Sequence, residues 1–231
     1  MKTRTFLFYL LAVLLGGCLP VISLHPLFNE KDVVFDEKLL GTWVEDPNTT
    51  WEFSRNVRWD RTEEPKNAYN KNAYKLIYTH QEKEDAKEKA KGSFIVWLVK
   101  LKDKLFLDIR PAGPPWEQQD PNKVEWVFNT SFLIPAHTFI KINSIEPQLK
   151  MLLTDDEKMK EFLKADPNAV KHDFPEDRLI LTASTKELQA FVLKYADDKR
   201  VFGNEGVLNR KKTAEPNAPP VLKPGKTSKQ K

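Results

Sequence analysis

Two side chains in this sequence, His137 and Asp108, are of types that could do chemistry together. His137 lies among apolar residues in a predicted strand, where an imidazole can contact a ligand or act as a general base. Asp108 lies late in another predicted strand and is a candidate polar group at the mouth of a β-barrel. Each residue also has an interpretation without chemistry: His137 as a histidine bonded to the backbone, and Asp108 as an aspartate on the surface.

A third candidate for ligand contact is Trp116, inside the proline-rich segment 111–123. Such a segment is irregular, so a tryptophan in it either folds back on the core or faces a partner. The remaining chemistry-bearing residues form no motif. The four histidines show no metal-ligand spacing, and they are His25, His80, His137 and His172.

Recognised enzyme and cofactor motifs do not occur. Adjacent acids such as Asp155-Asp156 point in different directions and do not form an acid–base pair. The eight glycines form neither a nucleophile elbow nor a phosphate-binding loop. We therefore expect a protein that is not an enzyme and holds no cofactor or metal.

Charge is unevenly distributed along the chain. The net charge is +4, but the segment from Arg210 to Lys231 contains seven basic residues and one acidic residue. The preceding body therefore lacks the excess positive charge of a nucleic-acid-binding surface. Residues 211–231 contain few large apolar side chains, and we predict a disordered basic tail there.

Cys18 is the only cysteine, and it follows an apolar run from Phe6 to Leu15. Lys2 and Arg4 precede that run. A ten-residue apolar run is too short to span a bilayer, which needs about 20 residues, but it suits a signal peptide. Residues 1–17 are thus a predicted signal peptide.

The sequence Leu15-Gly16-Gly17-Cys18 resembles the lipobox of bacterial lipoproteins. In that family the cysteine thiol receives a diacylglyceryl group, the signal is removed, and the protein stays on the membrane. The resemblance implies an exported protein with a lipid on Cys18 and a tether over residues 18–38. Leu19 is not the aspartate associated with inner-membrane retention, which favours the periplasmic face of the outer membrane in a Gram-negative cell.

Residues 39–210 read as one β-rich domain. Short runs of aromatic and β-branched residues alternate with polar residues, as in Trp51-Glu52-Phe53. Lys102-Asp103 is a predicted tight hairpin turn. The predicted strands are 40–46, 49–55, 73–80, 93–101, 104–110, 132–142, 147–153, 178–182 and 206–210.

Two capping boxes predict helices late in the domain. Thr154 with Glu157 opens a helix near 155–165, and Ser184 with Glu187 opens one near 186–198. Each carries an apolar stripe that we expect to face the core. The predicted fold class is mainly antiparallel β, either a barrel or a meander, with α+β as the alternative.

Gly41-Thr42-Trp43 resembles the Gly-x-Trp signature of lipocalin-like barrels. The resemblance implies that Trp43 plugs one end of a barrel while Gly41 allows close packing. It also implies that a late arginine, Arg210 or Arg178, stacks on the tryptophan. The two helices and the proline-rich loop depart from that family.

The mature chain is also similar to uncharacterised bacterial lipoproteins, through segments such as Phe106-Leu107-Asp108 and Pro135-Ala136-His137. That similarity implies no activity. Three functions remain open: a binding module for a small apolar ligand or an envelope component, a structural lipoprotein acting through protein contacts, and a hydrolase using His137 and Asp108. A binding module predicts an internal cavity of roughly 300–1,000 Å³. A structural lipoprotein predicts an exposed apolar patch near Trp116 or Trp59. A hydrolase predicts a close contact between the side chains of His137 and Asp108.

Overall fold

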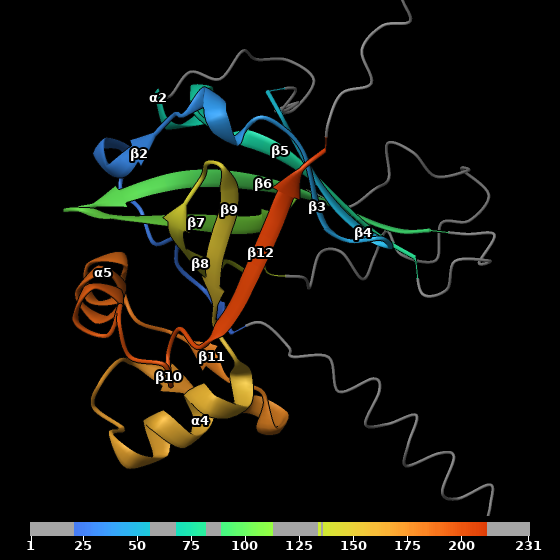
Figure 1. The fold of residues 1–231 in the computed structure, drawn as a ribbon. Helices are drawn as coiled ribbons and strands as arrows, with labels where there is room; N and C mark the ends of the chain where they lie inside the picture. Colours follow the sequence, from blue (N-terminus) through green and yellow to red (C-terminus); the bar gives the residue numbers. More distant parts are fainter. Residues whose placement is uncertain (1–20, 56–67, 82–88, 113–133, 135, 212–231) are drawn as a thin grey trace, which may run out of the picture.

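The computed structural model describes residues 21–55, 68–81, 89–112, 134 and 136–211. Eight antiparallel strands form a closed barrel (Figure 1). Strands that are consecutive in the chain pair with one another, and the last pairs with the first to close the barrel. The strands are β3 (Gly41–Asp46), β4 (Thr49–Ser54), β5 (Tyr74–His80), β6 (Ala90–Leu101), β7 (Lys104–Pro111), β8 (Thr138–Ser144), β9 (Gln148–Leu153) and β12 (Asn204–Arg210).

This architecture confirms the predicted mainly antiparallel β fold. Closure pairs both edges of the sheet, so no strand edge of the barrel is left open over its paired length. The β6–β7 hairpin turns at Lys102, whose φ of 56° suits a tight connection, as predicted. The predicted strand 178–182 is different: only Ile180–Leu181 (β11) is extended, and it lies outside the barrel.

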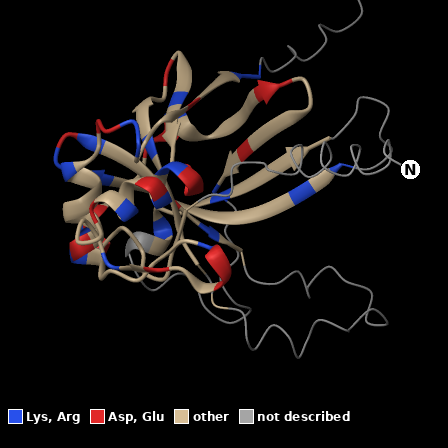
Figure 2. Ribbon diagram, turned by 90° about the horizontal axis from the view of Figure 1, so that it is seen from below, with Lys and Arg blue, Asp and Glu red and all other residues tan. Residues whose placement is uncertain are grey.

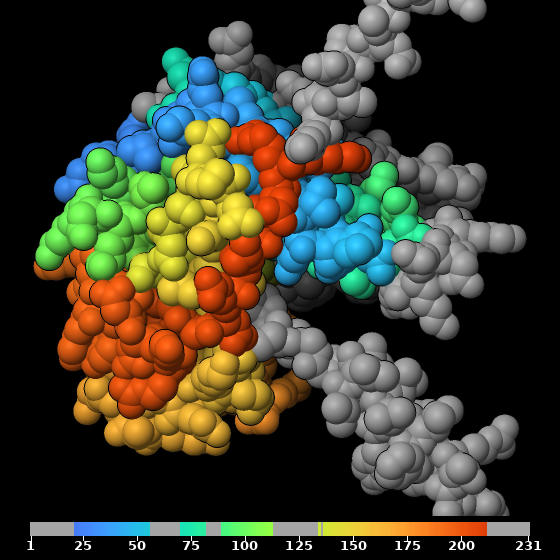
Figure 3. Space-filling model, viewed as in Figure 1, coloured from blue at the N-terminus to red at the C-terminus, as the bar shows by residue number. Residues whose placement is uncertain are grey.

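A second layer is inserted between β9 and β12 and packs beneath the barrel (Figure 3). It contains the predicted helices, α4 (Asp156–Ala165) and α5 (Thr185–Lys194). A small sheet lies beside them, made of β1 (Ile22–Ser23), β10 (His172–Asp173) and β11. The other short elements are η1 (Glu30–Asp32), β2 (Val33–Val34), η2 (Glu37–Leu39), α2 (Ala68–Lys71) and η5 (Pro175–Asp177).

The helix boundaries differ slightly from those predicted. Ser184 and Glu187 form the expected capping box of α5, but α5 ends at Lys194 rather than near Asp198. The N-cap of α4 is Asp155, whose side chain accepts from Lys158 N–H, rather than Thr154. Aspartate is an equally good N-cap, and the two adjacent candidates cannot be separated by residue type.

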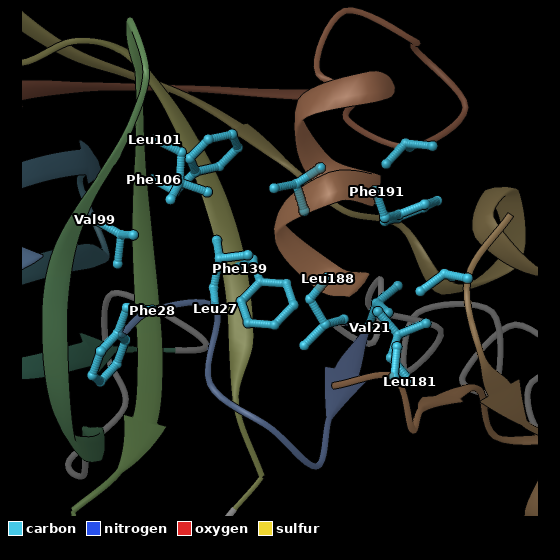
Figure 4. Packing of buried hydrophobic residues seen from close by; sticks show 14 of the residues in the cluster. Val21, Leu27, Phe28, Val99, Leu101, Phe106, Phe139, Leu181, Leu188 and Phe191 are labelled. Carbon is cyan, nitrogen blue, oxygen red and sulfur yellow. The ribbon is translucent and has the colours of Figure 1, made fainter. Parts of the chain in front are cut away.

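Hydrophobic side chains fill both sides of the barrel wall next to the helices. Val96 and Leu98 of β6 point into the barrel, whereas Trp97 and Val99 point outward. The outward residues pack against α5 and the lead-in, residues 21–30, which lies between the barrel and that helix (Figure 4). A strand buried on both faces reads as a continuous apolar run, which explains the sequence of β6.

The inside of the barrel is packed with buried side chains, including Trp43, Phe53, Tyr74 and Leu107. Each of these four is at most 2% exposed. The barrel centre is therefore a solid core and not the ligand cavity expected for a lipocalin-like protein.

The distribution of charge and the length of the helices both bear on function. Acidic and basic residues are interspersed over the described ribbon (Figure 2). Within the described residues, every helix is too short or too polar to cross a bilayer. The predicted lipobox, Leu15, Gly16, Gly17 and Cys18, lies outside the described residues, as do residues 212–231 of the disordered tail predicted over 211–231.

Candidate functional site

The outer wall of the barrel carries a buried carboxylate, that of Asp108. Asp108 lies in the middle of β7, paired with Trp97 on one side and Phe139 on the other. All three side chains point away from the barrel centre, because residues directly opposite one another share a face. The sequence predicted Asp108 at the barrel mouth or on the surface; it is instead fully buried, because the lead-in covers it.

Asp108 makes two hydrogen bonds to residues distant in sequence. The backbone N–H of Leu27 donates to Oδ2 at 2.6 Å, and Nδ1 of His137 lies 2.5 Å from Oδ1. His137 is itself 8% exposed. The structure thus brings together the two residues that the sequence singled out.

His137 is held in place through its backbone. It forms an isolated antiparallel bridge with Ser23, with two N–H···O=C bonds of 2.8 Å. Nδ1 is the ring nitrogen that contacts the Asp108 carboxyl group, so Nε2 is the ring nitrogen outside this contact.

Burial raises the pKa of the Asp108 carboxyl above its usual value. The hydrogen bonds from His137 and Leu27 and the positive charge of Arg110 act in the opposite direction. A buried carboxylate is tolerated only where such partners replace its lost hydration. The pair is therefore an integral part of the packing between lead-in and barrel.

A pocket of about 350 Å³ opens beside this pair. It lies on the outer wall of the barrel, between the lead-in, α2 and strands β6 and β7. Its lining combines apolar and polar side chains from these elements. The lining residues are Pro26, Phe28, Glu30, Asn70, Trp97, Arg110 and His137.

Ring contacts form the apolar side of the pocket. Phe28 packs on Trp97 with ring centroids 4.9 Å apart, and the Arg110 guanidinium lies 5.6 Å from the Trp97 ring centroid. Arg110 follows Asp108 by two residues in β7 and so faces the same side. Sequence reasoning missed Arg110, although its period-2 spacing from Asp108 was a usable signal.

The chemistry that this arrangement offers is hydrogen bonding and positive charge, together with one base. A histidine oriented by a carboxylate can take a proton from water or a substrate. None of the pocket-lining residues among those described carries a hydroxyl or thiol nucleophile. The described residues also contain no group of three or more metal-ligating side chains.

Other predicted positions lie away from this pocket. His80 Nδ1 contacts Thr49 Oγ1 at 3.0 Å, and His172 Nδ1 contacts the carbonyl of Val170 at 2.8 Å. Trp116 and Trp59, which the sequence marked as possible contact residues, lie outside the described residues.

The Gly-x-Trp signature occupies one end of the barrel, as the resemblance implied. Trp43 is completely buried, and its indole N–H donates to the Leu39 carbonyl at 2.9 Å. The guanidinium of Arg210 lies 4.3 Å from the Trp43 ring centroid. Gly41 has φ of +113°, and a Cβ there would lie 3.0 Å from Arg210 Nη1. A larger residue at Gly41 would be strained for both reasons.

Fold and pocket together define a class of protein: an eight-stranded up-and-down β-barrel with a solid centre and a ligand-sized pocket on its outer wall. No protein family model, no curated protein and no solved structure matches this chain.

Proposed function

We propose that this protein is an exported lipoprotein, anchored to a membrane through lipid on Cys18, and that its barrel is a non-catalytic binding module. Its ligand is a small molecule or an envelope component that enters the outer-wall pocket. The observation that carries the binding role is a pocket of ligand size whose walls combine Trp97 and Phe28 with Arg110 and His137. The packed barrel centre argues for this location over the interior.

The short link between Cys18 and the folded body supports work at a membrane surface. Of the tether predicted over residues 18–38, the part from Val21 on packs in the body. Two residues, Leu19 and Pro20, separate Cys18 from Val21, which is already buried at 2% exposure. The three residue steps from Cys18 to Val21 span at most about 11 Å when extended. A lipid on Cys18 would therefore hold the folded body close to the headgroups.

Metabolic labelling tests the anchor. A bacterial host expressing the wild type should incorporate labelled fatty acid into the protein, and Cys18→Ser should abolish this incorporation. Leu19→Asp serves as the matched variant, because it leaves the thiol in place and should retain the label. A wild-type protein with an unlabelled N-terminus would refute the lipoprotein assignment.

A panel of small neutral, acidic and basic organic molecules tests the binding role. We expect some members to shift the amide NMR signals of pocket-lining residues in the wild type. Asn70→Trp, which places a large side chain at the pocket, should abolish these shifts. Lys71→Trp, at the exposed neighbouring position of α2, should retain them. If no member of the panel shifts these signals, the binding role is wrong.

A hydrolase is the second candidate, and one observation favours it: the 2.5 Å contact between Asp108 and His137 beside the pocket. His137 would act as the general base toward water. Activated esters such as p-nitrophenyl acetate provide the test. Turnover above the buffer rate that is lost in His137→Asn would favour catalysis, and equal rates in the two proteins would exclude this assignment.

A further inference from the structure

The pocket contains a cation with no carboxylate partner among the described residues, Arg110. The described ion pairs of the chain involve other basic groups, while the Arg110 guanidinium rests on the face of Trp97. Its Nε is buried without a hydrogen-bond partner. Buried polar groups are almost always satisfied, so an unsatisfied one beside a pocket calls for an explanation.

A second unsatisfied atom belongs to Asn70, another residue that lines the pocket. Asn70 Oδ1 is buried and makes no hydrogen bond. A guanidinium needs acceptors, whereas an amide oxygen needs a donor. The two groups therefore call for a ligand that presents an acceptor at one point and an O–H or N–H at another.

The surroundings of Arg110 indicate whether the acceptor group of the ligand is charged. Asp108 is adjacent to Arg110 along β7, but its two oxygens already face Leu27 N–H and His137 Nδ1. Asp108 therefore does not serve the Nε–H donor of Arg110, which is left for an acceptor on a ligand. Guanidinium groups bind carboxylates through two parallel hydrogen bonds, and this is about twice as strong as binding neutral acceptors.

The other walls limit the body of the ligand. Pro26, Phe28 and Trp97 form the apolar part of the lining, in which Phe28 and Trp97 are largely buried, and Glu30 is exposed. A volume of about 350 Å³ is sufficient for a small organic molecule. Glu30 also disfavours ligands with several negative charges.

From these groups we infer that the pocket binds a small organic carboxylate that also carries a hydroxyl or amino donor and a short apolar body. The carboxylate pairs with Arg110, the donor bonds Asn70 Oδ1, and the apolar part lies against Phe28 and Trp97. This inference rests on the binding role proposed above and specifies the ligand class.

Mandelate is a suitable probe, because it combines a carboxylate, a hydroxyl and one ring. Titrations of the full chain, followed by NMR signals of pocket-lining residues, compare mandelate with two close analogues. Mandelamide lacks the charge and should bind about tenfold or more weakly, as expected for a hydrogen bond to a charged group. Phenylacetate lacks the hydroxyl and should bind several-fold more weakly.

Variants separate the contribution of Arg110 from nonspecific charge effects. Arg110→Gln should weaken mandelate about tenfold or more and leave mandelamide nearly unchanged. Arg178→Gln removes the same charge from an exposed position and should leave both affinities unchanged. The comparison of mandelate with mandelamide on the wild type remains decisive even if Arg110→Gln fails to fold.

Several results would overturn the inference. Equal affinities for mandelate and mandelamide would exclude a carboxylate site, and equal affinities for mandelate and phenylacetate would exclude the donor contact. Inorganic phosphate binding as tightly as mandelate would indicate a phosphate site instead. Shifts caused by neutral molecules but not by mandelate would overturn the ligand class while leaving the binding role standing, whereas a pocket that responds to no probe of any charge would overturn both.

Discussion

Asp108 and Leu27 are joined by a 2.6 Å hydrogen bond across 81 residues of sequence. This bond fastens the lead-in to the outer wall of the barrel. The opposite side of the same peptide segment is held by α5, since Gln189 donates to the Leu27 carbonyl at 2.9 Å. Thr185 also donates, to the neighbouring Pro26 carbonyl at 2.9 Å. The lead-in is thus a structural part of the body and forms one wall of the pocket.

Removal of the Asp108 carboxylate should destabilise the whole domain. Asp108→Ala leaves the buried Leu27 N–H and His137 Nδ1 without their acceptor, which costs about 2–4 kcal/mol of unfolding free energy. Urea denaturation measures this loss. Glu52→Ala, at an exposed carboxylate on β4, should stay within about 0.5 kcal/mol of the wild type. Similar values for the two variants would mean that Asp108 does not hold the lead-in.

Arg210 should stabilise the end of the barrel at Trp43 through its planar guanidinium group. It donates to the carbonyls of Leu40, at 2.7 Å, and of Lys38 while covering Trp43. Arg210→Ala should cost about 1–2 kcal/mol, given that the side chain is partly exposed. Arg210→Lys should recover less than half, because an ammonium cannot reproduce the fixed fork of donors. Thermal unfolding checks this, with Lys211→Ala as the neutral control. Full recovery by lysine would show that charge alone matters.

Glu187 should make stability depend on pH in the acidic range. Its hydrogen bonds to Lys171 and Ser184 lower the pKa of this carboxyl from 4.5 to about 2. Because the folded-state pKa lies below the unfolded value, the stabilisation is complete above about pH 4.5 and is lost as the pH falls toward 2.

Thermal unfolding between pH 6 and 2 tests this dependence. The difference in stability between the wild type and Glu187→Gln should shrink over the interval from about pH 4.5 to 2. Glu161→Gln, at an exposed position of α4, is the matched control. A difference that stays constant over this interval would contradict the lowered pKa.

Lys141 should attach the helical layer to the barrel. Its buried amine, on the outward face of β8, donates to the Ala196 carbonyl at 2.9 Å and to Asp197 Oδ1 at 2.7 Å. Lys141→Ala should lower the unfolding free energy by about 1–3 kcal/mol, through lost packing and an unsatisfied carbonyl. Urea denaturation alongside Lys150→Ala, exposed on β9, provides the comparison. An unchanged midpoint in Lys141→Ala would rule out this role.

Local patterns in the sequence were sufficient for most of the elements. Period-2 alternation located the barrel strands, and the Ser184–Glu187 capping box located α5. The Gly41–Trp43 signature led to the prediction that a late arginine, Arg210 or Arg178, stacks on Trp43, and the structure places Arg210 there. The strands and the start of α5 depend on neighbours in the chain and on backbone geometry. The Gly-x-Trp contact depends on a motif that packs in the same way in other barrels.

The location of the pocket could not be read from the same patterns. Asp108, His137 and Leu27 meet only because the lead-in crosses the outer wall of the barrel. Periodicity shows that alternate residues of β7 share a face, but not which face is inside when both are apolar. The 178–182 segment shows the same limit, since its apolar run predicts a strand but not its partners, which are β1 and β10 and not the barrel strands.

The sequence by itself therefore determined the strands of the barrel, the start of α5 and the residues of the Gly-x-Trp end, because these follow from local preferences or from a recurrent motif. Only the tertiary structure decided that the barrel centre is solid and that the pocket lies outside it. The physical reason is that long-range packing selects which of two apolar faces is enclosed, and burial of Asp108 becomes favourable only when Leu27 and His137 are both in place.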